Sequence, residues 1–277
     1  MTTDIPAALI ERVEAEAYAE FSASAATTAR DALGTRQLRI GGGVALAMPY
    51  DSSGFFSKTI GLGFAEPITA QLLSQIIEFY REQGMPSASL RIAPRSVPAD
   101  WAGICAKLGL REEPPGEVKL VGDLRTLAAG SGPVRLDAGL RVVQISPGQV
   151  EEWARVMFEG YGLPVDPHHE MAIGVYGKPG WYSFAVLEGD AIIAAANLYV
   201  HGSVADLFGS ATLPKARRRG AQSALIAARI ATARDAGCTW LLGDTDAEGP
   251  GEHNSSLHNM LRAGLDFRYL RQNWTWG

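Results

Sequence analysis

The sequence contains few cysteines and no long apolar run, and each shortage excludes a class of protein. Cys105 and Cys238 are the only cysteines among 277 residues, so the chain is not a disulfide-rich secreted scaffold. Both lie in apolar surroundings with no cysteine nearby, which predicts two buried thiols; a disulfide between them is the alternative. No apolar run approaches the roughly 20 residues of a membrane helix, so we expect no membrane partner.

The start of the chain lacks the pattern of a secretory signal. It reads Met-Thr-Thr-Asp-Ile-Pro, without a basic start or a following apolar segment. We therefore expect a cytoplasmic protein. Alanine and arginine are both abundant, which favours a bacterial source with a GC-rich genome.

Basic residues are fewer than acidic residues. The chain has 25 Lys and Arg residues against 30 Asp and Glu residues, a formal net charge of −5. Its basic residues cluster locally instead of covering a face, so we expect no nucleic-acid partner. With 47% hydrophobic and 20% charged residues, the chain suffices for one large or two ordinary folded domains.

Hydrophobic periodicity and turn residues predict alternating helices and strands. In the first half we expect helices at 4–33, 69–83 and 99–108 and strands at 38–49, 55–64 and 87–93. In the second half we expect a strand at 140–145, a helix at 147–159 and a hairpin formed by 181–187 and 191–200.

The most informative stretch is 204–246, which is typical of a strand, a basic turn, a helix and a second strand. Residues 204–213 are rich in β-branched and small side chains, which predicts the first strand. Residues 221–236 have a helical period, and Gly237 follows them at the position of a helix C-cap. Residues 238–243 are then expected to form a buried strand.

The turn before this predicted helix favours an anion. It contains the consecutive residues Arg217, Arg218 and Arg219, followed by Gly220. A helix start offers unpaired N–H groups and a positive dipole end, glycine permits close approach, and arginine offers a fork of donors. A phosphate or pyrophosphate ligand is therefore predicted; the alternative is a solvated turn that binds nothing. The phosphate loop of nucleotide hydrolases and the dinucleotide fingerprint are both absent.

This turn resembles the signature loop of the GNAT superfamily of acyl-coenzyme A-dependent N-acyltransferases. The family pattern is Gln/Arg-x-x-Gly-x-Gly/Ala, and its fixed positions are occupied here by Arg217, Gly220 and Gln222. Gln222 replaces the usual small residue.

A second stretch, at 253–265, is similar to the family's Asn-x-x-Ser…Gly-Phe helix. Ser256 and Gly264 match it, the asparagine is offset by one at Asn254, and Leu265 replaces the phenylalanine. The resemblance covers roughly residues 139–277.

The resemblance implies acetyl-coenzyme A as co-substrate, inserted between two splayed strands of the central sheet. It implies that backbone groups at Ala211, Thr212 and Leu213 pair with the pantetheine arm. The implied pyrophosphate and helix-start contacts are Arg218, Arg219, Gly220, Ala221, Gln222 and Ser223. Asn254 and Ser256 are implied to lie near the pantetheine.

The catalytic residues follow less directly from the resemblance. The position at which many family members carry a tyrosine acid is Met260 here, which cannot donate a proton. Asn259, His258 or water is therefore expected to serve the departing thiolate. Candidates for the base are Glu170, which we favour, and His168, Glu159 and Asp206.

Two further groups of polar residues bear on ligand binding and metal binding. We expect Asp244 and Asp246 either to bind a cationic amine or to cap the following loop. We expect no metal at His168-His169-Glu170, because adjacent histidines on a strand point to opposite sides.

The first half repeats the element order of the second. Gly84 corresponds to Gly237, and Lys107-Leu-Gly-Leu110 corresponds to Arg262-Ala-Gly-Leu265. The first copy has Glu66 where the second has its arginines, which predicts a degenerate copy that has lost cofactor binding. The alternative is a chance likeness between two α/β segments.

Together these features predict an α/β (α+β) fold of two GNAT-like domains, each a mixed, mostly antiparallel sheet flanked by helices. The expected parts are a degenerate domain at 1–127, a linker at 128–138 and a catalytic domain at 139–277. The expected activity is transfer of an acetyl group to a primary amine by direct attack in a ternary complex, with a small molecule or a protein as acceptor. The alternatives are a non-catalytic acyl-coenzyme A sensor and a scaffold of two vestigial domains. Trp274 and Trp276 are expected to form a buried or interface anchor, and a homodimer is a further expectation.

Overall fold

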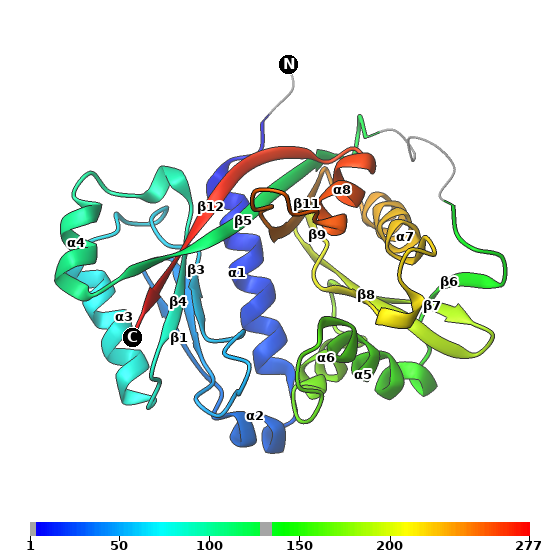
Figure 1. Ribbon diagram of the computed structural model, residues 1–277, viewed down its shortest axis with the longest axis horizontal. Helices are drawn as coiled ribbons and strands as arrows, with labels where there is room; N and C mark the ends of the chain where they lie inside the picture. The colour runs from blue at the N-terminus through cyan, green and yellow to red at the C-terminus, as the bar shows by residue number, and fades with distance from the viewer. Residues whose placement is uncertain (1–3, 128–134) are drawn as a thin grey trace.

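A computed structural model describes residues 4–127 and 135–277 of the chain (Figure 1). The predicted linker, 128–138, lies mostly outside these described residues. The helices are α1 (Ala7–Ser24), α2 (Thr27–Leu33), α3 (Ala70–Glu82), α4 (Trp101–Leu108), α5 (Val150–Tyr161), α6 (His169–Val175), α7 (Ala221–Asp235) and α8 (Ser255–Arg262). None of them is long and apolar enough to cross a membrane.

The strands belong to one continuous sheet. They are β1 (Arg36–Ile40), β2 (Gly43–Ala47), β3 (Lys58–Ile60), β4 (Ala88–Ile92), β5 (Arg111–Asp123), β6 (Leu140–Gln144), β7 (Trp181–Glu188), β8 (Ala191–His201), β9 (Val204–Asp206), β10 (Ser210–Thr212), β11 (Trp240–Asp246) and β12 (Asp266–Trp276). Their order is β1-β2-β3-β4-β12-β5-β11-β9-β8-β7-β6, and β10 pairs with β8. Among the described strands only β3–β4 and β9–β11 run parallel, so the predicted fold class is confirmed.

The sheet order shows the internal repeat. Outward from the centre, β12 is followed by β4, β3, β2 and β1, and β5 is followed by β11, β9, β8 and β7. The single parallel pair occupies the same place in each half. Strand β5 of the first half pairs with β11, and β12 of the second half pairs with β4, so each half contributes its last strand to the other (Figure 1). The domain boundaries remain a prediction.

Several helices and strands have bounds in the structure that differ from the predicted ones. The helix expected at 4–33 is divided at Ala25 and Ala26, where the backbone is extended. The strand expected at 55–64 is reduced to β3, because Gly61 and Gly63 adopt left-handed angles that end it. The strand expected at 204–213 is interrupted between β9 and β10. Strands β5 and β12 were not predicted.

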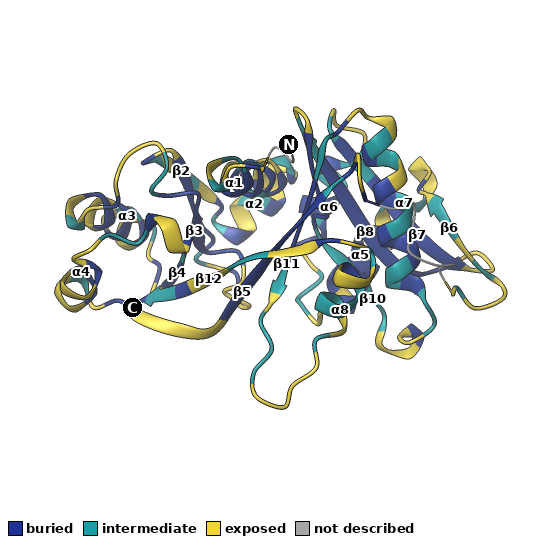
Figure 2. Cartoon of the chain, turned by 90° about the horizontal axis from the view of Figure 1, so that it is seen from above, coloured by how far each residue is buried: buried dark blue, intermediate teal, exposed yellow. Residues whose placement is uncertain are grey.

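Helix α1 packs at the centre of the molecule, between the two halves (Figure 1). Its residues Val13 and Phe21 belong to the same hydrophobic core as Trp153 and Met171 of the second half. Strand β5 changes from exposed at 111–115 to buried from Gly116 onward, where it passes beneath α1 (Figure 2). The two halves therefore share one apolar core.

The remaining packing predictions concern the cysteines and the C-terminal tryptophans. Cys105 and Cys238 are both free and buried, as predicted. Trp276 stacks on Tyr80 with ring centroids 6.4 Å apart, so it is anchored in the first half's core. The predicted homodimer is not tested by a single chain.

Buried charges cross the central strands beneath α1. Arg271 on β12 pairs with Glu11 and Glu14 of α1 and with Glu117 of β5. Lys119 on β5 lies 2.8 Å from Glu14. The guanidinium of Arg271 and the ammonium of Lys119 lower the pKa of Glu14 against the effect of burial. Each of these buried side chains thus has a counter-ion, as burial of a charge requires.

Candidate functional site

A cleft of about 1190 Å³ opens beside β11. Strands β9 and β11 pair from Val204–Trp240 to Asp206–Leu242. Beyond this point the chain leaves β11, and β10 pairs instead with β8. The cleft is lined on one side by residues 209–212 and on the other by 244–248. The strand interruption that the sequence did not predict therefore creates the opening.

One edge of β10 faces this opening. The Leu213 N–H donates to Ile193 on β8, whereas the Ser210 N–H on the other edge donates to the Tyr161 hydroxyl at 2.7 Å. Because backbone N–H groups alternate along a strand, the Thr212 N–H points to the same edge as that of Ser210. Of the predicted pantetheine contacts, Ala211 and Thr212 line the cleft and Leu213 does not.

The basic turn closes one end of the cleft. Arg218 and Gly220 have left-handed φ angles of 64° and 84°, and α7 begins directly after them. A Cβ atom at Gly220 would lie 1.8 Å from the Arg135 carbonyl oxygen, so only glycine fits. The first N–H groups of α7 have no acceptor within the helix. Ala221, Gln222 and Ser223 all line the cleft, and their contact with a cofactor stays a prediction.

The three arginines of the turn have different surroundings. Arg217 donates to the carbonyl groups of Thr212 and Gly160, which fixes the turn against β10 and α5. Arg219 pairs with Glu188 at 2.6 Å and Asp137 at 3.0 Å, and these bonds raise its pKa. Arg218 lines the cleft, and within the described chain no hydrogen bond or ion pair engages it. The Arg219 side chain does not line the cleft.

Gln222 joins α7 to α8. Its Nε2 donates to the Ser256 hydroxyl at 2.8 Å, and its Oε1 accepts from Asn259. The Ser223 hydroxyl donates to Asn259 at 3.3 Å. The glutamine that departs from the family pattern therefore has a structural role in fixing α8.

Asn254 begins α8 and also binds β11. Its Oδ1 accepts from the Ser256 and Leu257 N–H groups, which caps the helix. Its Nδ2 donates to Thr245 at 3.0 Å and to the Asp246 carbonyl at 2.8 Å. Asn254, Ser256 and Asn259 all line the cleft.

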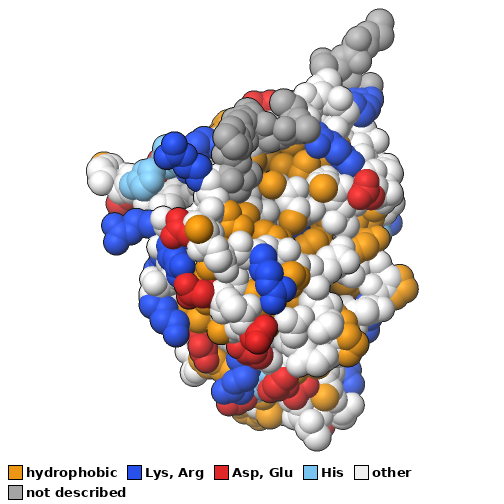
Figure 3. Space-filling model, turned by 90° about the vertical axis from the view of Figure 1, so that its right-hand side faces the viewer, with side chains coloured by type: hydrophobic (Ala, Val, Ile, Leu, Met, Phe, Trp, Pro, Cys, Tyr) orange, Lys and Arg blue, Asp and Glu red, His pale blue; other side chains and the backbone are white. Residues whose placement is uncertain are grey.

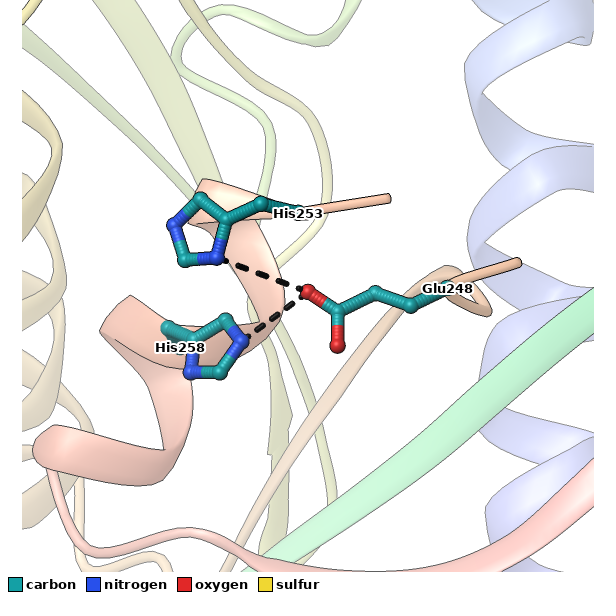
Figure 4. A group of neighbouring side chains, drawn as sticks. All are labelled: Glu248, His253 and His258. Carbon is teal, nitrogen blue, oxygen red and sulfur yellow. Dashed lines mark hydrogen bonds and ion pairs between the residues drawn. The ribbon is translucent and has the colours of Figure 1, made fainter. Parts of the chain in front are cut away.

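His258 does not line the cleft but points to Glu248 (Figure 4). Its Nε2 lies 2.9 Å from Glu248 Oε1, and His253 Nδ1 lies 3.8 Å from the same oxygen. The two imidazole rings stack with centroids 4.5 Å apart. These three donor groups lie within 4.8 Å of one another, a spacing that suits a metal ion. The expectation that no metal binds remains a prediction.

Glu170 and its two histidine neighbours are not on a strand. The argument against a metal site that assumed a strand here was therefore wrong. His168 precedes α6, and His169 and Glu170 form its first turn. His168 binds Asp51 at 2.9 Å and His169 binds Glu151 at 3.1 Å, so the rings diverge. Glu170 is not among the residues that line the cleft, and its role as base stays a prediction.

The end of the cleft opposite the basic turn is built by both halves. Asp244 lies there at the end of β11, with 29% of its side chain exposed. Asp206 is buried nearby on β9, and burial together with the charge of Asp244 raises its pKa to about 8. Tyr18 and Glu117 of the first half line the same space. Sequence reasoning missed the first-half residues, because only the pairing of β5 with β11 brings them here.

The chain resembles known proteins both in its sequence and in its fold. Residues 149–253 match the model of the "Acetyltransferase (GNAT) family". Comparison of the sequence with curated proteins gives no match.

Among solved structures, a GCN5-related N-acetyltransferase from Kribbella flavida is similar over 96% of this chain and 94% of its own, with 17% identity and a TM-score of 0.61. A tandem GNAT protein from the clavulanic acid biosynthesis pathway is similar over 74% of this chain and 68% of its own, with 16% identity and a TM-score of 0.54. On the side of the molecule that is on the right in Figure 1, acidic and basic side chains are interspersed (Figure 3).

Proposed function

We propose that this protein transfers an acetyl group from acetyl-coenzyme A to a primary amine, because residues 149–253 match the model of the acetyltransferase (GNAT) family. The observation that carries the proposal is the cleft itself. It joins an unengaged arginine and a helix start at one end to a partly exposed carboxylate at the other. The family match supports acyl transfer in general, and the choice of acetyl donor and amine acceptor is ours.

The basic turn would hold the pyrophosphate of the coenzyme. Arg218 supplies a charged fork, and Gly220 to Ser223 supply the N–H groups of the helix start. The pantetheine arm would pair with the open edge of β10, as an added strand pairs with a sheet edge. The Thr212 N–H is the donor available on this edge, because Tyr161 already accepts the N–H of Ser210.

The acetyl group would then lie near Ser210 and Asp244. An incoming ammonium must lose a proton before its nitrogen attacks the thioester carbon, and Asp244 is the cleft carboxylate placed to receive it. As the new C–N bond forms and the C–S bond breaks, the nitrogen gives its second proton to water and the thiolate takes a proton from a nearby donor, which regains one from solvent. The Tyr161 hydroxyl lines the cleft beside β10 and is our choice for this donor, because the family's tyrosine position is Met260.

This assignment differs from the sequence-based one in its base and acid. Glu170, His258 and Asn259 were predicted, and of these only Asn259 lines the cleft. The alternative function, a non-catalytic acyl-coenzyme A sensor, predicts binding without turnover.

The test is release of coenzyme A thiol from acetyl-coenzyme A in the presence of a broad panel of primary amines. The proposal predicts release that depends on the amine, with an acetylated amine detected by mass spectrometry. Tight binding of acetyl-coenzyme A with no release for any amine or peptide would instead support the sensor.

A further inference from the structure

The amine end of the cleft has an aromatic wall. Besides Tyr161, six aromatic rings line it, and four of the six come from α1 or the loop before β3 in the first half. The six are Tyr18, Phe21, Phe55, Phe56, Phe158 and Phe208. We call them the aromatic wall.

The aromatic wall is continuous. The Phe208 ring contacts those of Tyr18 and Phe21, with centroids 5.0 Å apart in both pairs. Phe56 lies 6.1 Å from Phe158 and 5.0 Å from Phe55. Phe56 is buried, whereas Phe55 is 40% exposed. The Phe55 ring therefore offers apolar surface that packing within the protein does not use.

The amine of Lys58 already lies against this wall. The Nζ of Lys58 is 3.8 Å from the Phe55 ring centroid and 4.4 Å from that of Tyr18. This is the geometry of a cation–π contact. Burial and the charge of Arg91 lower the pKa of Lys58 well below its usual value.

The carboxylates beside the wall provide for one ammonium group. Glu117 lines the cleft but is engaged by Arg91 and Arg271. Asp244 has a longer contact, 3.6 Å from Lys119, and is partly exposed. Arg229 is buried in the cleft lining and adds positive charge. Asp244 can therefore receive one ammonium group beside the wall.

We infer that the acceptor is a small primary monoamine with an aromatic or similarly flat apolar body. Its amine would lie at Asp244 and its body against Phe55 and Tyr18. This inference rests on the proposed function and narrows the acceptor to one chemical class. It also gives the first half a role in the site, because α1 and the loop before β3 supply the surface that binds the body.

The test compares 2-phenylethylamine with ethanolamine and spermidine as acceptors for the full chain. We expect kcat/KM for 2-phenylethylamine to exceed that for ethanolamine by at least about tenfold, the effect of burying one apolar side chain. Phe55→Ala should bring this ratio close to one and leave the affinity for acetyl-coenzyme A unchanged. Phe267→Ala is the control, since Phe267 is 60% exposed on β12 and does not line the cleft.

The outcomes separate the inference from the proposed function. Acetylation of ethanolamine, spermidine or a peptide lysine at least as fast as 2-phenylethylamine would overturn the inference and keep the acetyltransferase. Failure of acetyl-coenzyme A to bind would overturn the function itself. If the coenzyme binds but no amine reacts, 2-phenylethylamine is titrated by calorimetry into the complex of the protein with coenzyme A. Binding of the amine would support the inference, and absence of binding would overturn it.

Discussion

The ammonium of Lys119 lies 3.6 Å from the carboxylate of Asp244, across the pairing of β5 with β11. Although burial opposes it, the charges of Asp244 and Glu14 raise the pKa of Lys119. A charged lysine from the first half thus faces the carboxylate that we place at the reacting amine. The two halves of the chain are joined at the site as well as in the core.

Replacement of Asp244 by asparagine should lower kcat by about 10²–10⁴-fold, the usual contribution of general base catalysis. The amide keeps the size of the side chain but cannot take a proton. The affinity for acetyl-coenzyme A, measured by calorimetry, should not change. Asp235→Asn, on the exposed end of α7, is the control. If Glu170→Gln causes the loss of kcat and Asp244→Asn does not, the base is the one predicted from the sequence.

Gly220→Ala should abolish binding of the coenzyme. The new methyl group would collide with the Arg135 carbonyl, at a φ of 84° that alanine disfavours. Gly237→Ala is the matched control, because Gly237 also has a positive φ but no atom lies within 4 Å of its Cβ position. The control should lose only about 1–2 kcal/mol of stability, the cost of a left-handed alanine, and should bind the coenzyme normally. Equal binding by both variants would show that the turn does not hold the ligand.

Arg271→Ala should destabilise the protein by about 3–5 kcal/mol, because three buried glutamates lose a counter-ion. These are Glu11, Glu14 and Glu117. Arg268→Ala removes an exposed pair with Asp4 from the same strand and should cost at most about 1 kcal/mol. Chemical denaturation of both variants measures the difference. Similar losses would mean that the buried network adds nothing to the stability.

The contact between Asp51 and His168 should make the stability of the protein depend on pH in the acidic range. Burial opposes ionisation, but hydrogen bonds from His168 and Ser53 lower the Asp51 pKa from 3.8 to about 2. A lowered folded pKa means that the contribution, about 2 kcal/mol, is complete above pH 3.8 and is lost as the pH falls toward 2. Asp51→Asn should remove this dependence, as thermal unfolding between pH 2 and 5 would show. An unchanged slope in the variant would contradict the assignment.

The sequence predicted the parts of the site that are local in the chain. The basic turn and the helix after it follow from residue types at short spacing, and the serine of α8 follows from the resemblance to the GNAT family. The structure places Gly220, Gln222 and Ser256 together in one cleft. The separate surroundings of Arg218 and Arg219 could not be predicted, because Asp137 and Glu188 come from other segments.

Contacts that depend on β5 and β12, the strands that the two halves contribute to each other, could not be predicted from the sequence. Strand β5 begins with Arg-Glu-Glu-Pro-Pro at 111–115, and prolines conceal its strand character. Without β5 and β12, neither the shared sheet nor the position of Tyr18 and Glu117 beside Asp244 could be inferred. The α6 helix was missed because glycine and proline clusters precede it, and its Gly174 approaches α1 so closely that a Cβ would lie 1.9 Å from the Ser24 carbonyl oxygen.

The most direct test of the account is calorimetric titration of acetyl-coenzyme A into the wild type, Arg218→Ala and Arg39→Ala. Arg39 pairs with Glu16 on the surface of the first half and serves as the control. We predict saturable binding to the wild type and the control, and a loss of at least about tenfold in affinity for Arg218→Ala, the value of a hydrogen bond to a charged group. No binding to the wild type, or equal binding by all three proteins, would contradict the assignment of this cleft to the coenzyme.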